Sequence, residues 1–84
     1  MKKPADLLVK ATAVVLRRLR EHAEISQEEL AARAGLSRSM IDKSERRKRL
    51  PSLDVVMKIA SGLETEASEI VRLIEQELND SAAD

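Results

Sequence analysis

The sequence predicts an all-α domain of five helices that takes up all of residues 1–84. Apolar residues recur every three or four positions along most of the chain, which is the period of an amphipathic helix. No segment alternates apolar and polar residues as a half-buried strand does. Only two glycines and two prolines occur among the 84 residues, so no flexible linker divides the chain into two domains.

The first helix is expected over about residues 4–22. Apolar residues recur at helical spacing from Leu8 to Leu19. A proline such as Pro4 is tolerated in the first turn, because the N–H that it lacks would have no helical partner there. A break in the pattern follows at residues 23–25.

The second helix begins at a capping box, Ser26-Gln27-Glu28-Glu29. The Ser26 hydroxyl is expected to accept a hydrogen bond from the amide of Glu29, and the Glu29 carboxylate is expected to reach back to Ser26. Gly35 ends this short helix, because glycine adopts the left-handed C′ conformation without strain. The buried stripe of the helix consists of Leu30, Ala31 and Ala34.

The third helix is expected from Arg38 to about Arg46, with Ser37 as its N-cap. Met40 and Ile41 are its only apolar residues. Most of its surface must therefore face something other than a protein core. Residues 47–50 are expected to form a loop.

The last two helices complete the domain. Ser52 is expected to cap the fourth helix, Leu53 to about Gly62. Thr65 is expected to cap the fifth helix, about residues 66–79, and residues 80–84 are expected to fray.

The composition excludes several functional classes. There is no cysteine and only one histidine, His22, which excludes disulfides and cysteine nucleophiles and leaves too few ligands for zinc. There is no aromatic residue on which single-stranded nucleic acid could stack. No apolar run is long enough to span a bilayer, and Lys2 and Lys3 introduce no signal peptide. We therefore expect a cytoplasmic protein without metal, cofactor, membrane association or small-molecule ligand.

The net charge is zero, but the charges are unevenly distributed. Residues 33–49 carry seven basic and two acidic side chains, whereas residues 62–84 carry seven acidic side chains and one basic side chain. Such asymmetry favours a nucleic-acid-binding face in the middle of the chain. A solvated surface with chance clustering is the alternative, and the charges alone do not decide between the two.

The segment most informative about function is 26–46, in which two short helices are joined by a tight turn at Gly35. Ala31 is small enough for the second helix of the pair to cross close to the first. The second helix has an exposed polar face, which fits the major groove of DNA when the first helix braces it from behind. This arrangement predicts a helix-turn-helix that binds double-stranded DNA. An unrelated helical hairpin is the alternative.

These residues resemble the Xre, or phage repressor/Cro-type, helix-turn-helix family over about residues 14–63. The resemblance implies a five-helix, lambda-repressor-like domain that binds palindromic operator DNA as a homodimer and regulates transcription without being an enzyme. The short chain and its acidic fifth helix further resemble the controller proteins of restriction–modification systems. The matching residues are Ser26-Gln27-Glu28-Glu29-Leu30-Ala31, Ala34-Gly35-Leu36-Ser37-Arg38-Ser39, Ile41, Glu45-Arg46 and Pro51-Ser52-Leu53.

Position by position, the resemblance implies that Arg38 and Ser39 reach base edges, with Arg38 as a bidentate ligand of guanine O6 and N7. Gln27 is expected to touch a phosphate or the outer edge of the site, and Met40 lies where it could touch a thymine methyl group. Arg46, Arg47 and Lys48 are expected to contact phosphates, which fixes the register without reading sequence. The other residues implied to contact DNA are Ser37, Asp42, Lys43 and Arg49.

Arg20 and Glu45 match a pair that forms a salt bridge between the first and third helices in the family. Three other positions depart from the family pattern. Glu24 and Arg47 replace glycines that often need a positive φ, so both loops are expected to follow a different path. Ser44 replaces an apolar residue, and its hydroxyl is expected to bond back to a helical carbonyl.

The fifth helix is expected to form the interface of a two-fold dimer, because its apolar stripe is generous for a terminal helix and a monomer would leave part of it exposed. One alternative is that the stripe closes the core of the monomer. Another is that it binds a different protein, as in an antitoxin or an adapter module. The stripe consists of Ile70, Val71, Leu73, Ile74 and Leu78.

Overall fold

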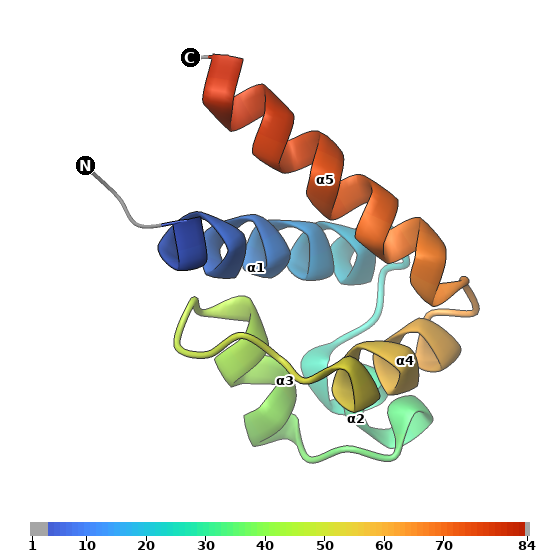
Figure 1. Cartoon of the computed structure of the whole chain (residues 1–84). Helices are drawn as coiled ribbons and strands as arrows, with labels where there is room; N and C mark the ends of the chain where they lie inside the picture. The colour runs from blue at the N-terminus through green and yellow to red at the C-terminus, as the bar shows by residue number, and fades with distance from the viewer. Residues whose placement is uncertain (1–3, 84) are drawn as a thin grey trace.

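The computed structural model describes residues 4–83, and it confirms the all-α fold (Figure 1). Three serine-capped helices follow a long first helix, and a long fifth helix ends the chain. None of the helices in this part of the chain is long and apolar enough to cross a membrane. The helices are α1 (Pro4–His22), α2 (Gln27–Ala34), α3 (Arg38–Glu45), α4 (Leu53–Gly62) and α5 (Ala67–Ala83).

All five helices contribute to one hydrophobic core. Figure 1 shows α1 and α5 on one side of the molecule and the shorter helices on the other. Helix α1 packs against α5 and α3, and α2 packs against α3 and α4. Burying each large apolar side chain contributes about 1.5–3 kcal/mol. One large residue from each helix is almost fully buried: Leu16, Leu30, Ile41, Ile59 and Ile70.

Serine side chains begin the three middle helices, as expected. The hydroxyls of Ser26, Ser37 and Ser52 each accept a hydrogen bond from the amide three residues later, at 3.0, 3.2 and 3.3 Å. The second half of the predicted capping box is wrong. The Glu29 carboxylate instead accepts a hydrogen bond from Arg33 Nε, one turn further along α2, at 3.1 Å.

Helix α5 differs from its expected bounds at both ends. It begins at Ala67, so Thr65 lies outside its N-cap position, and it continues to Ala83 instead of fraying after residue 79. Glu77 pairs with Arg18 of α1 at 3.2 Å and Leu78 packs against the core, so α5 is held against the domain as far as these residues.

The stripe of α5 largely closes the core of the chain itself. Ile70 and Ile74 are buried within the monomer, which corrects their expected place in a dimer interface. Leu73 and Leu78 are half-buried and pack against the same core. Val71 alone of the five is exposed, at 45%. The physical reason is that α5 lies along α1 and α4, which cover the isoleucine side of the stripe.

Two loops keep the left-handed backbone conformation despite the absence of glycine. Glu24 has φ 59° and Arg47 has φ 61°, so the expectation of a different loop path is wrong. Glu64, which no feature of the sequence singled out, has φ 57°. These residues follow α1, α3 and α4, where a left-handed residue reverses the chain at the end of a helix.

Replacing Glu24 by glycine is expected to raise the free energy of unfolding by about 0.5 kcal/mol. A left-handed conformation costs an L-residue about 1–2 kcal/mol, and the flexibility of glycine in the unfolded chain offsets about 0.5–1 kcal/mol of that gain. Urea denaturation followed by circular dichroism measures the change. Glu75→Gly, in the exposed interior of α5, is the matched control and should lose about 1 kcal/mol. An equal fall in the free energy of unfolding of Glu24→Gly and Glu75→Gly would contradict the prediction.

Candidate nucleic-acid interface

Helix α2 packs against α3 on one side and closely against α4 on another. Ala31 and Ala34 of α2 are buried. Gly62 of α4 lies so close to α2 that a Cβ atom added to it would stand 3.2 Å from the Ala34 amide nitrogen. The close packing holds α2 firmly, and α2 in turn fixes the position of α3.

Helix α3 has one buried side and one exposed side. Ile41, Ser44 and Glu45 are buried. The Ser44 hydroxyl donates a hydrogen bond to the Met40 carbonyl at 2.9 Å, as expected, and this satisfies a polar atom in an apolar place. The exposed residues of α3 are Arg38, Ser39, Met40 and Lys43, and we call these four residues the reading side.

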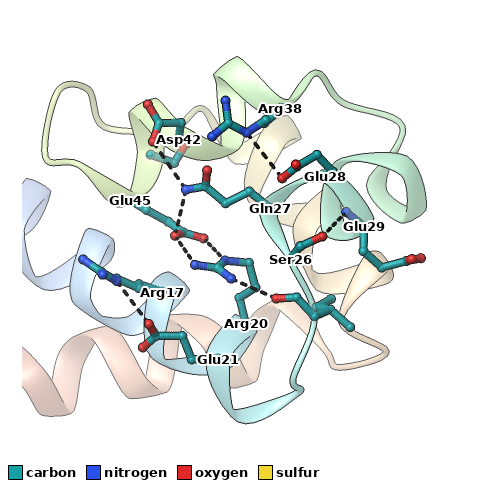
Figure 2. Close-up of polar contacts among 12 residues, drawn as sticks. Arg17, Arg20, Glu21, Ser26, Gln27, Glu28, Glu29, Arg38, Asp42 and Glu45 are labelled. Atoms are coloured by element: carbon teal, nitrogen blue, oxygen red, sulfur yellow. Dashed lines mark hydrogen bonds and ion pairs between the residues drawn. The ribbon is translucent and has the colours of Figure 1, made fainter.

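An ion pair joins α1 to the end of α3 (Figure 2). Arg20 Nε donates to Glu45 Oε2 at 2.7 Å, and Arg20 Nη2 donates to Glu45 Oε1 at 3.0 Å. Arg20 Nη1 also donates to the Ile25 carbonyl at 2.8 Å. The two side chains are only 13% and 3% exposed. The hydrogen bond with Glu45 raises the pKa of Arg20. One guanidinium group thus fixes α1, the loop after it and α3 relative to one another.

Gln27 lies between α2 and α3 and is held there by its amide group. Its Nε2 atom donates to Asp42 Oδ1 at 3.4 Å and to Glu45 Oε1 at 3.3 Å (Figure 2). Asp42 also accepts a hydrogen bond from Arg46 Nη1 at 3.1 Å. That bond lowers the pKa of Asp42, and the bond from Gln27 adds to the effect. Asp42 is therefore ionised at neutral pH and links Gln27 to Arg46.

Arg38 begins α3 and lies opposite an acidic residue of α2. Its Nε atom is 3.3 Å from Glu28 Oε1, and both side chains are well exposed (Figure 2). The sequence placed Glu28 only in the capping box and gave no sign of this pair. The spacing along the chain could not show it, because the two residues belong to different helices.

The basic loop after α3 is exposed from Arg46 to Arg49. Arg49 lines a hollow together with Met40 and Lys43 of the reading side. Arg47 and Lys48 line a second hollow with Lys10, Asp6 and Val9 of α1, so three cations face one carboxylate there. Lys10 was not singled out from the sequence, although residues 1–24 carry six basic side chains and only three acidic ones. The loop therefore extends the positive surface from the reading side towards α1.

The arrangement presents donor groups on one side of a helix and cations beside it. A helix with such a side fits the major groove, and the flanking cations match the phosphates at its edges. Within residues 4–83, no three histidine, aspartate or glutamate side chains come together to hold a metal ion.

Comparisons with known proteins agree with this geometry. Residues 16–70 match the model of a family described as helix-turn-helix. The restriction-modification controller protein C.AhdI from Aeromonas hydrophila is 37% identical, with a TM-score of 0.71 over 74% of this chain and 94% of that one. The wild-type restriction-modification controller protein C.Esp1396I is 25% identical, with a TM-score of 0.78 over 84% and 93%.

A third structure shares the fold. The clp gene regulator ClgR from Corynebacterium glutamicum is 20% identical, with a TM-score of 0.82 over 90% of this chain and 81% of that one. No curated protein sequence is significantly similar to the chain.

Proposed function

We propose that this chain, which belongs to the Xre/Cro-type helix-turn-helix family of DNA-binding transcription regulators, binds a palindromic operator as a homodimer. The observation that carries the proposal is the reading side of α3, which stays exposed while Ile41, Ser44 and Glu45 of the same helix are buried. Its similarity to two restriction-modification controller proteins supports the same role here, the control of such a system.

Each side chain of the interface has a proposed task. Arg38 binds guanine O6 and N7, and Ser39 and Met40 contact neighbouring base edges. Lys43 and the basic loop 46–49 bind phosphates or reach the groove edge. Asp42 orients Gln27 and Arg46, to which it is already bonded, while the first amides of α2 approach a phosphate.

A dimer is proposed because one reading helix of eight residues offers few base contacts. Two copies related by a two-fold axis would place their reading helices in successive major grooves, about 34 Å apart. Since Ile70 and Ile74 are buried, the contact is assigned to the apolar side chains that remain exposed. Leu53 and Met57 lie one turn apart on α4 and are 70% and 56% exposed, and Val71 contributes from α5.

Replacing Leu53 by glutamate is therefore expected to convert a dimer into a monomer. A buried carboxylate without a partner opposes association strongly. Sedimentation equilibrium at about 10 μM protein, a concentration well above the dissociation constant of a stable dimer, measures the mass. Ala32→Glu, which adds the same charge at an exposed position of α2, is the control and should remain dimeric. A wild-type protein that sediments as a monomer would refute the homodimer. If Leu53→Glu stays dimeric, the interface lies elsewhere.

Selection of binding sites from random DNA duplexes tests the function directly. At a stated salt concentration, the expected result is a palindromic consensus whose half-sites are centred one helical turn apart. Enrichment of no sequence would refute sequence-specific binding. A single unrepeated half-site would refute the palindrome and keep the DNA-binding function.

A further inference from the structure

Glu28 is an acidic residue at the edge of a surface that is otherwise suited to a polyanion. It lies in the first turn of α2, next to Gln27, and a carboxylate there repels the phosphate that the α2 amides would attract. The binding of phosphates therefore does not explain why a carboxylate stands at position 28. Besides favouring the N-terminal end of α2, the Glu28 carboxylate lies 3.3 Å from Arg38 Nε of α3.

The contact with Glu28 leaves the two terminal nitrogens of Arg38 free. Glu28 Oε1 faces the Nε atom of the guanidinium group, whereas a bidentate contact with guanine can be made by the two terminal nitrogens, Nη1 and Nη2. The carboxylate therefore lies beside Nε and leaves the terminal pair unoccupied.

Arg38 is the cation that Glu28 can orient. Arg20 also lies within electrostatic reach of Glu28, but its donors are already bonded to Glu45 and to the Ile25 carbonyl. Asp42 is the other carboxylate near Arg38, and it is bonded to Arg46 and Gln27. Since Arg20 and Asp42 are bonded to other groups, Glu28 and Arg38 remain as partners for each other.

We propose that Glu28 is a positioning residue that sets base preference by holding the Arg38 guanidinium with its terminal nitrogens directed at the base edge. The proposal rests on the proposed function, because it needs Arg38 to read a base. It separates two effects of the carboxylate. Repulsion of phosphates weakens binding to every sequence alike, whereas orientation of Arg38 changes the preference at one base pair.

Glu29 provides a matched control. It is the next residue of α2, is also acidic and exposed, and pairs with Arg33 within its own helix. Removing either carboxylate changes the charge of the α2 N-terminus in the same way. Exposed ion pairs contribute little to stability, so both alanine variants should fold, which thermal unfolding followed by circular dichroism checks.

The experiment measures two affinities for each variant: one for the selected operator, and one for an operator changed at the base pair whose preference Arg38→Ala abolishes. The ratio of the two cancels charge effects, because both duplexes carry the same phosphates. Glu28→Ala is expected to lower this ratio about threefold to tenfold, a part of what one good bidentate contact provides. Glu28→Gln, which keeps an acceptor oxygen, should lower it less, and Glu29→Ala should leave it unchanged.

Glu28→Ala should also have no effect on the ratio once Arg38 is alanine. An unchanged ratio in Glu28→Ala, an equal fall in Glu29→Ala, or a fall that persists without Arg38 would each overturn the positioning role. The proposed function would survive all three results. A selection that enriches no operator would overturn both.

Discussion

Replacing Glu45 by alanine is expected to lower the free energy of unfolding by about 3 kcal/mol. The change leaves the Arg20 guanidinium, only 13% exposed, without its bidentate partner, and an unpaired buried charge costs about 3–5 kcal/mol. Gln27 also loses one of its acceptors. Since a domain of this size has a total stability of about 4–13 kcal/mol, urea denaturation should show a large shift of the midpoint.

The exposed ion pair between Arg17 and Glu21 is the control for the Glu45 variant. It joins two residues one turn apart on α1 at 3.4 Å, and both side chains are more than half exposed. Glu21→Ala is expected to change stability by less than about 0.5 kcal/mol. Comparable losses from the two alanine variants would show that the burial of the Glu45 pair has no energetic consequence.

Replacing Arg38 by alanine is expected to remove about 1–3 kcal/mol of discrimination at one base pair of each half-site. The reason is that the lost side chain is the exposed fork at the start of α3. Titrations of the operator and of single-base variants by fluorescence anisotropy of labelled DNA give the affinities. Equal losses on operator and random DNA would refute a base-reading role for Arg38.

Lys48→Ala is the control for Arg38→Ala, and it is expected to lower affinity without changing base preference. It lies in the exposed loop after α3, so its loss should weaken binding to all sequences alike. It should also reduce the slope of log affinity against log salt by about one. A selective loss on the operator would place Lys48 at a base instead of a phosphate.

Local signals in the sequence were sufficient for most of the fold. The serine caps fixed the starts of three helices, and Gly35, with φ 70°, fixed the end of α2. The end of α5 lacked such a signal, since no glycine or proline follows residue 79. The left-handed conformation at Glu64 was equally hidden, because the tertiary fold imposes it on a residue that does not favour it. At Glu24 and Arg47 only the glycines of the family pattern marked the position.

At the candidate site, the sequence did not show which surfaces pack against one another. A helical stripe shows which side of α5 is apolar, but not whether the same chain or a second copy covers it. Ile70 and Ile74 were therefore assigned to an interface that the monomer core takes instead. The contacts of Gln27 and Glu28 across the turn depend on how α2 and α3 cross, and the spacing of residues along the chain does not specify that angle.

Because the Arg20–Glu45 pair is buried, dissolved ions screen it much less than they screen the exposed charges of this protein. Mobile ions screen the exposed arginines and lysines that would hold DNA, and reach a nearly inaccessible pair far less. Raising the ionic strength should thus detach the protein from its operator while the scaffold behind α3 keeps its shape. Recovery on dilution would then require no refolding.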